Sequence, residues 1–355
     1  MERTSTLSKA ITLMQIPAVI IIIVLHSYTT ARGSISDTDN TAYYYLSYLL
    51  SMDIGNMGVP LYFTISGILF FNNFTNRQSY HTKIKSRMKT LAIPYICWNL
   101  ANIILFFLLQ NLEFTKSYFS GNNKLVSDYS IVDFLKAFWD TGGGTPILSP
   151  YWYIRNLLIL QVLSPVIFIL IKHIKLAYLL AVGALWFTTP TLTFTYTSIF
   201  YFSLGAYVSI HNIDLIGLTN KYFNHIITLF ILMLCTEIYL HFNVTSSYLI
   251  YLQKALFIIG VISFFTLAIK AVEHNINIPN SLGKASFFIY TTHYPIMQGI
   301  RRISLKFVNN SPSEIGNVCA YLGAIIITFI LCYILYIGLK KIAPKTLAFT
   351  TGERS

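Results

Sequence analysis

Charge is the scarcest property of this sequence. Only 11% of its 355 residues are Asp, Glu, Lys or Arg, whereas an ordinary soluble domain carries about 25%. With 55% hydrophobic residues, the chain has too little charge to cover the surface of a soluble protein. The composition therefore predicts an all-α, polytopic membrane protein. Long apolar runs favour helices over a β-barrel, whose strands are short and alternating.

Acidic residues are scarcer than basic ones, and cysteine is rare. The 25 Lys and Arg residues against 13 Asp and Glu residues give a net charge of +12. In a membrane protein this excess is typical of cationic cytoplasmic loops, so it does not indicate nucleic-acid binding. The four cysteines lie in apolar segments without metal-ligand or redox spacing, and we interpret them as small core residues: Cys97, Cys235, Cys319 and Cys332.

About ten apolar segments bounded by polar or turn residues predict about ten transmembrane helices. The first has the length of a retained span rather than of a signal peptide. We place the segments at 11–31, 43–71, 89–110, 151–171, 174–188, 194–210, 225–242, 248–270, 285–304 and 316–339.

Cationic loops predict the orientation of these segments in the cell inner (cytoplasmic) membrane. Residues 72–89 carry five cations and no acid, whereas 111–150 is mixed in charge. The positive-inside rule makes 72–89 a cytoplasmic loop, 111–150 an outer loop, and both termini cytoplasmic. Arg301, Arg302 and Lys306 fall on the predicted outer side. Either the ninth segment is misplaced or these cations have a role there.

Two features stand out within the loop 111–150. Residues 131–139 show apolar side chains at helical spacing, which predicts a helix that lies on the membrane surface or caps the bundle. Thr141 begins the run Thr-Gly-Gly-Gly-Thr-Pro, which lacks the GK[ST] ending of a phosphate-binding loop. We interpret this run as a flexible turn.

His26 lies near the far end of an uncharged run of about twenty residues. An ionisable side chain at membrane depth needs a partner and is a functional candidate. A neutral imidazole can accept a proton from a hydroxyl at neutral pH, so His26 is a candidate general base. A packing role, with the ring hydrogen-bonded to a neighbouring helix, is the alternative.

A second histidine, His293, lies in the apolar segment 285–304. Glu237 and His241 are four residues apart and share one face of a helix, which is compatible with a structural pair, and Asp53 falls near the outer end of its segment. Because no spacing like HExxH is present, we expect no metal site.

Three cations precede the third segment at alternate positions: Lys85, Arg87 and Lys89. They are followed by a Pro-Tyr pair that ends at Tyr95. Lys and Arg bind phosphate groups with charge-assisted hydrogen bonds, so this stretch is a candidate phosphate site. Orientation of the chain and contacts with anionic lipids are equally good explanations.

Aromatic residues open the fourth segment at Tyr151, Trp152 and Tyr153, as in the belt at a membrane boundary. Arg155 follows just inside the predicted outer boundary and needs a partner or a wet cavity. An anionic or sugar ligand stacked on the aromatics would supply one, so we assign Arg155, Trp152, Tyr153 and His293 as candidate substrate-binding residues.

Small residues mark the second segment, which reads Gly-Val-Pro-Leu-Tyr-Phe-Thr-Ile-Ser-Gly from Gly58. Gly, Ser and Thr allow membrane helices to approach closely, so this stretch predicts tight helix packing. Ser66 as a nucleophile paired with a histidine is the less favoured interpretation.

Taken in order, these stretches resemble the membrane-bound acyltransferase-3 family, the bacterial polytopic enzymes that O-acylate sugars. The resemblance spans nearly the whole chain and implies one transmembrane domain over 1–355. It rests on the helix that ends in His26, VPLYFTISG, the basic-then-PY stretch that ends at Tyr95, YWYIRNL, the FSLGAY of Phe202 to Tyr207, and SFFIYTTHYPI.

The resemblance implies transfer of an acyl group, usually acetyl from cytoplasmic acetyl-CoA, to a hydroxyl of a glycan or lipid-linked sugar. His26 would correspond to the essential first-helix histidine, and Lys85, Arg87 and Lys89 would sit where the family engages CoA. Two positions depart from the family. Gln15 stands where many members have an arginine, and Thr90 stands where many have the second arginine of a pair.

Two other classes of protein stay open: a transporter or flippase of a glycan or acyl intermediate, and a non-catalytic assembly subunit. The sequence shows no repeated halves of the kind common in transporters. For an enzyme, direct transfer with His26 as base and a covalent acyl relay are both open, as are acetyl, succinyl and longer donors. The sequence does not indicate an oligomeric state.

Overall fold

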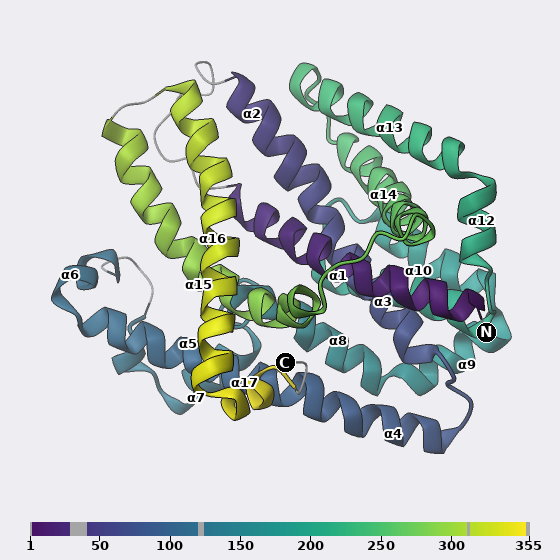
Figure 1. Ribbon diagram of the computed structural model, residues 1–355, viewed down its shortest axis with the longest axis horizontal. Coiled ribbons are helices and arrows are strands. Elements are labelled where there is room, and N and C mark those ends of the chain that lie inside the picture. The colour runs from purple at the N-terminus through teal and green to yellow at the C-terminus, as the bar shows by residue number, and fades with distance from the viewer. Residues whose placement is uncertain (1, 29–40, 120–123, 311–312, 353–355) are drawn as a thin grey trace. The chain divides into compact units, whose positions relative to one another are not determined.

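The computed structural model describes residues 2–28, 41–119, 124–310 and 313–352 (Figure 1). Over these ranges every regular element is a helix, which confirms the all-α prediction. The chain divides into two compact units, which we describe separately. Unit 1 comprises Met1–Phe74 and Pro165–Gly338, and unit 2 comprises Thr75–Ser164 and Leu339–Ser355.

Each predicted apolar segment is helical over its described residues, some of them as two or more successive helices, but fewer than ten have the length and composition of a membrane span. Within the described ranges six do, or up to eight if each bent helix pair is one span. Of the remaining segments, α10 (Leu176–Thr188) is short, and α15 (Asn280–Asn310) carries His293, Arg301 and Arg302. The six are Thr6–Ser27, Ala42–Phe71, Arg77–Asn111, Phe223–Asn243, Leu249–Glu273 and Glu314–Ile342.

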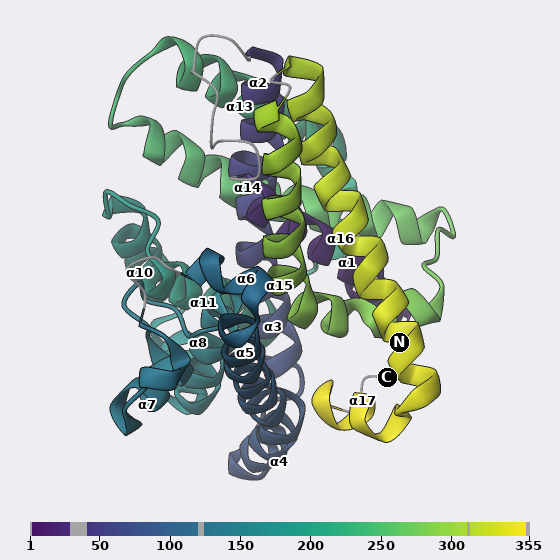
Figure 2. The ribbon, with the colours of Figure 1, turned by 90° about the vertical axis from the view of Figure 1, so that its left-hand side faces the viewer.

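Unit 1 is built around α1 (Glu2–Ser27), which packs against α15, α14 (Leu249–Glu273) and α3 (Gly58–Phe71). Between α2 (Thr41–Ser47) and α3 the chain forms a π-helix, Tyr48–Ile54, and a 3₁₀ turn, Gly55–Met57. Figure 2 shows α13 beside α14. The other helices of this unit are α9 (Ser164–Ile174), α10, α11 (Phe194–Ile210), α12 (Leu215–Lys221), α13 (Phe223–Asn243) and α16 (Glu314–Ile342).

The small residues of α3 make the close helix packing that the sequence predicts. Gly67 lies against the backbone of α11, and a Cβ at this position would overlap the carbonyl oxygen of Phe202. Reciprocally, a Cβ on Gly205 would overlap the carbonyl oxygen of Thr64. The two glycines therefore allow α3 and α11 to cross with their backbones in contact, as in other membrane helix pairs.

Unit 2 begins with a helix where the sequence analysis predicts a loop. Within 72–89, residues Arg77–Arg87 form α4, which continues through a π-helix, Met88–Ala92, into α5 (Ile93–Asn111). Asn76 caps α4, because its side chain accepts from the Ser79 amide while the Ser79 hydroxyl accepts from the Asn76 amide. No Gly or Pro interrupts the chain from residue 77 to residue 93, so the helix propagates into α5.

The segment 111–150 folds back along α5. The predicted helix at 131–139 is confirmed as α7 (Ile131–Trp139), and Ala137 packs with Ile103 of α5 and Val126. The Val126 amide donates to Gln110 Oε1, and the Leu148 amide donates to Asn99 Oδ1. This segment also contains α6 (Glu113–Lys116) and 3₁₀ turns at Ser117–Phe119, Val126–Asp128 and Ser149–Tyr151; α8 (Trp152–Val162) and α17 (Pro344–Thr350) complete unit 2.

The outward face of α7 is apolar. Ile131 is 82% exposed and Leu135 is 68% exposed, while Ala137 on the opposite face is buried. An amphipathic helix of this kind suits a membrane surface. The lipid contact of α7 stays a prediction.

The cysteines differ in their surroundings. Cys332 is buried as predicted, Cys97 is half-buried, and Cys235 and Cys319 are exposed. The interpretation as core residues therefore fails for Cys235 and Cys319, which project outward from apolar helices. An apolar sequence context does not distinguish the two faces of a helix that carries apolar residues all round.

We expect Gly67→Ala or Gly205→Ala to lower the thermal stability of the purified protein in detergent. The added methyl group must force apart two backbones, and overpacking a close contact costs about 1–3 kcal/mol. Gly323→Ala in α16 is the control, because no atom lies within 4 Å of a Cβ there. Equal melting temperatures for all three variants would contradict the close crossing.

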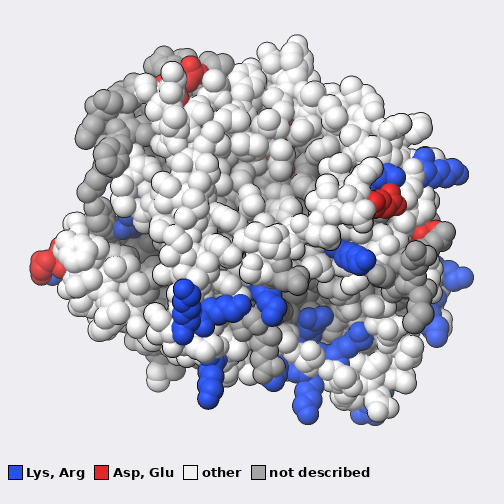
Figure 3. Space-filling view, viewed as in Figure 1, with Lys and Arg blue, Asp and Glu red and all other residues white. Residues whose placement is uncertain are grey.

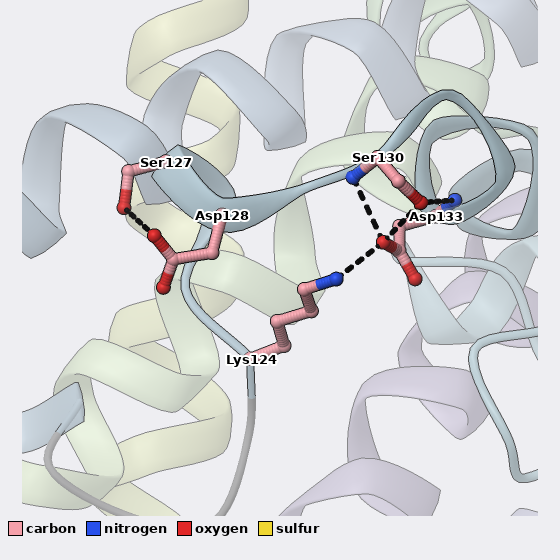
Figure 4. A network of polar contacts seen from close by, with 5 residues as sticks. All are labelled: Lys124, Ser127, Asp128, Ser130 and Asp133. Carbon is pink, nitrogen blue, oxygen red and sulfur yellow. Dashed lines mark hydrogen bonds and ion pairs between the residues drawn. The ribbon is translucent and has the colours of Figure 1, made fainter.

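The Asp133 carboxylate fastens the start of α7 (Figure 4). Lys124 Nζ lies 2.6 Å from Asp133 Oδ2, and the Ser130 amide and hydroxyl donate to the same oxygen. The Lys124 and Ser130 hydrogen bonds hold the pKa of Asp133 well below its ordinary value. A depressed pKa means that the carboxylate stabilises the fold above the unfolded-state pKa of about 3.9, and that this is lost as pH falls through the folded-state pKa.

We therefore expect Asp133→Asn to increase proteolytic cleavage near α7 at pH 7. The wild-type protein should show no such change between pH 7 and about pH 5, because Asp133 stays ionised there. Asp128→Asn is the matched control, since Asp128 accepts a hydrogen bond from the neighbouring Ser127 alone among the contacts in Figure 4. Enhanced cleavage of wild type at pH 5 would mean that another group controls this segment.

Candidate functional site

The two intramembrane histidines of the sequence come together in unit 1. His26 lies in the last turn of α1, and its ring centroid is 5.4 Å from that of His293 in α15. Tyr294 completes the group, with its ring 5.1 Å from His26 in an edge-on arrangement. His26 is half-buried, whereas His293 is fully buried. The fold therefore brings together two histidines that are far apart in the sequence.

Local hydrogen bonding fixes the tautomer of His293. Its Nδ1 atom lies 2.7 Å from the carbonyl oxygen of Tyr290, and a carbonyl can only accept, so Nδ1 carries the proton. In the neutral ring Nε2 then holds a lone pair. That atom is buried and has no hydrogen-bond partner within the described residues. His293 thus offers an unoccupied acceptor next to His26.

The chain around Ser51 holds the end of α1 that carries His26. The Ser51 hydroxyl donates to the Val24 carbonyl at 2.6 Å, and Tyr321 lies 2.6 Å from the same hydroxyl and so donates to it. A Cβ on Gly55 would lie 3.0 Å from Leu25 Cα, so the glycine allows direct backbone contact beside His26. Short π-helical segments such as the one that contains Ser51 are frequent at functional sites.

The three predicted donor-site cations do not share one face. Lys85 and Lys89 are four residues apart and exposed, whereas Arg87 is half-buried and lies near Tyr153 of α8. Alternate residues in a helix point in nearly opposite directions, which is why Arg87 turns toward α8. Figure 3 shows Lys and Arg side chains gathered over α4 and the C-terminal segment of unit 2.

Arg155 has partners within its own unit. Its guanidinium donates to the carbonyl oxygens of Trp139 and Gly144 and lies over the Trp139 ring, 5.2 Å from the centroid. These contacts hold the turn that follows α7. They give the guanidinium hydrogen-bond acceptors within the protein, and its role in binding substrate stays a prediction.

Arg155 lies beside the first turn of α5. Arg155 and Tyr95 donate to the consecutive carbonyls of Trp139 and Phe138. Tyr95 is the third residue of α5, which continues from α4 through the π-helix Met88–Ala92. The position of Arg155 near the outer membrane face stays a prediction.

Other predicted positions have packing contacts. Tyr151 is buried and stacks on Tyr95, and Trp152 is also buried, so neither ring lies on an outer belt. The Asp140 carboxylate accepts from the amides of Gly142 and Gly144, which lowers the pKa of Asp140. These glycine amides are therefore already paired, which supports the interpretation of the glycine run as a turn.

Lys254 is a buried cation that sequence reasoning missed. It lies inside α14, and its ammonium group donates to carbonyl oxygens at the end of α10. The last carbonyls of a helix lack partners within the helix, so a lysine can cap them. The segment around it is otherwise strongly apolar. A single Lys among apolar residues is the feature of the sequence that could have indicated a buried cation.

The C-terminal segment docks beside the basic stretch of unit 2. Trp98 Nε1 donates to the Thr350 carbonyl at 3.0 Å, and Thr351 is buried. Gly352 has a φ of +68°, and a Cβ there would lie 2.6 Å from Thr90 Cα. Both the left-handed backbone and the close contact require glycine here. The sequence of this tail contains no motif that predicts the contact.

The predicted site residues thus fall into two groups. His26 and His293 belong to unit 1, and Lys85, Arg87, Lys89, Trp152, Tyr153 and Arg155 belong to unit 2. Over the ranges that the structure describes, no group of three or more His, Cys, Asp or Glu residues could hold a metal ion.

The apolar helices of membrane-spanning length in the described ranges define a multi-pass membrane protein, and the histidine pair of unit 1 is its candidate centre for acid–base chemistry. The chain belongs to the acyltransferase-3 family, because the acyltransferase domain of that family matches residues 8–337. It is therefore a membrane acyltransferase. This confirms the resemblance found in the sequence.

A curated relative supports the same assignment. The succinoglycan biosynthesis protein ExoH of Rhizobium meliloti (strain 1021) is 22% identical over 320 residues, which cover 88% of this chain and 83% of ExoH. No solved structure matches the chain.

Proposed function

We propose that this protein is an integral membrane O-acyltransferase that moves an acyl group, such as acetyl, from cytoplasmic acyl-CoA to a hydroxyl of a glycan or lipid-linked sugar. The observation that carries the proposal is the contact of His26 with His293 inside a chain of this family. The relative named for succinoglycan biosynthesis favours a polysaccharide or its precursor as the acceptor.

In the proposed reaction His26 is the general base. Its imidazole removes the proton of the acceptor hydroxyl while the hydroxyl oxygen attacks the thioester carbonyl carbon. The tetrahedral intermediate then collapses, the carbon–sulfur bond breaks, and the imidazolium returns the proton to the CoA thiolate. The free Nε2 of His293 can accept a hydrogen bond from the acceptor and hold it beside His26. A nearby cation or backbone N–H would stabilise the oxyanion.

For the donor, we propose that Lys85 and Lys89 bind the CoA phosphates. Both are exposed on one side of the helical stretch that joins α4 to α5, and ammonium groups bind phosphate with charge-assisted hydrogen bonds. Arg87 lies near Tyr153, so its side chain would help to hold this helical stretch beside α8.

The proposed location is the cytoplasmic membrane with both termini in the cytoplasm. Support comes from the docking of the C-terminal segment on α5 and Thr90. This contact places the C-terminal segment beside the basic stretch of unit 2. The positive-inside rule then favours the cytoplasm for the basic stretch and the C-terminus together.

We expect His26→Ala to lower the acyl-transfer rate by about 10²–10⁴-fold, the usual effect of removing a general base. The measurement is transfer from acyl-CoA by purified protein in detergent, together with the change in surface glycans by mass spectrometry. His293→Ala should have a smaller effect. His173→Ala is the matched control, because His173 is exposed at the end of α9.

A His26→Ala variant that keeps more than about a tenth of the rate would exclude His26 as the base. Loss of abundance without any change in rate per molecule would favour a structural subunit. Export or flipping of a glycan without acyl transfer by the wild-type protein would favour the transporter.

We expect the double variant Lys85→Glu/Lys89→Glu to raise the KM for acyl-CoA and to leave the acceptor KM nearly unchanged. Salt should weaken donor binding by wild type in part, because exposed charges are screened over about 8–10 Å. Lys116→Glu/Lys136→Glu is the matched control, with the same charge change at exposed positions in 111–150. An unchanged donor KM in correctly inserted protein would assign these lysines to orientation alone.

A further inference from the structure

A second polar cluster lies in unit 1, apart from the histidine pair. Asp53, in the π-helix Tyr48–Ile54, is 0% exposed, and Glu237 of α13 is 1% exposed. Tyr48 donates its phenol proton to Glu237 Oε1 at 2.9 Å, and Gln253 Nε2 lies 3.5 Å from the Tyr48 oxygen. Segments far apart in the sequence therefore enclose two acids.

Three of the four carboxyl oxygens of this pair lack a donor in the part of the chain that the structure describes. The two groups lie close enough to interact with each other, yet both oxygens of Asp53 and Oε2 of Glu237 have no hydrogen-bond partner within the described residues. All of these atoms are acceptors if the acids are ionised. Buried acceptors without donors are unfavourable, and two neighbouring carboxylates repel each other.

The neighbouring charged and titratable groups do not balance two negative charges. The groups that interact with the pair include Tyr48, Gln253 and His241, whose ring stacks on Tyr48 at 3.6 Å. Tyr28, directly after α1, lies close enough to Tyr48 to interact with it electrostatically, and Tyr321 of α16 is hydrogen-bonded to Ser51. Lys254 of α14 turns its ammonium group to the end of α10.

We propose that Asp53 and Glu237 together form a proton-binding site, which holds one proton from water between the facing carboxyl groups. A proton on one carboxyl supplies the missing donor, since its O–H can be donated to the carboxylate opposite, and it removes one of the two charges. A metal ion fits less well, because no group of three or more potential ligands occurs over the described ranges.

This site lies next to Ser51, which supports the end of α1 that carries His26. Asp53 shares its π-helix with Ser51, which donates to Val24, two residues before His26. Loss of the proton would place two negative charges in this segment and strain the packing of α13 against it. The proposal does not depend on acyl transfer, and its test measures protonation and stability rather than activity.

The first test is infrared spectroscopy of the purified wild-type protein. At pH 7–8 exposed carboxyl groups are ionised, so we expect a C=O band of a protonated carboxylic acid from this pair. Asp53→Asn or Glu237→Gln should remove the band, and Glu113→Gln, at an exposed position, should leave it. A wild-type spectrum without this band at pH 7 would overturn the proposal, even if neither cluster variant folds.

The second test is the thermal stability of the same proteins as a function of pH. A folded state that keeps a proton which the unfolded chain releases must lose stability as pH rises. We expect wild type and Glu113→Gln to lose several degrees in melting temperature between neutral and alkaline pH. Asp53→Asn/Glu237→Gln, which stays neutral, should lose less and be the more stable protein at the alkaline end.

A pH dependence in the double variant equal to that of wild type would overturn the proposal. Stabilisation of wild type by Na⁺ at alkaline pH, without a response of the double variant, would also overturn it. That result would show that the pair binds a metal cation rather than a proton.

Discussion

A bilayer core supplies no water, so each polar group inside this bundle must find its partner in the protein. Ser51 donates to a carbonyl of α1, and Lys254 caps the end of α10. Against this background, the unpaired acceptor atoms of His293, Asp53 and Glu237 mark places where a hydroxyl or a proton completes the structure. The same constraint that orders the scaffold therefore points to its chemistry.

Much of the scaffold could be predicted from periodicity. The apolar segments, the helix at 131–139 and the close packing at Gly67 follow from local patterns, because helix length and residue size act over a few residues. His26 could be identified as a candidate for a similar reason, because it is a lone ionisable residue in an uncharged run of the sequence.

The partners of these residues could not be predicted, because they depend on contacts between distant segments. Nothing near His26 in the sequence indicates that Tyr294 will lie against it, and the stretch around Asp53 does not point to Glu237. The mixed charge of 111–150 predicts an outer loop but does not indicate how the loop folds. Its return along α5 depends on single hydrogen bonds, such as that from Val126 to Gln110, which have no periodic signature.

The docked C-terminus has a practical consequence for handling this protein. Gly352 lies against Thr90, so an affinity tag or fluorescent protein appended at this end follows closely in sequence on a residue that contacts the basic stretch of unit 2. A bulky or acidic fusion there would interfere with the proposed donor-binding residues Lys85 and Lys89, and it would pull on the segment that Trp98 holds. Purification handles belong at the other end of the chain, so that assays report the native surface.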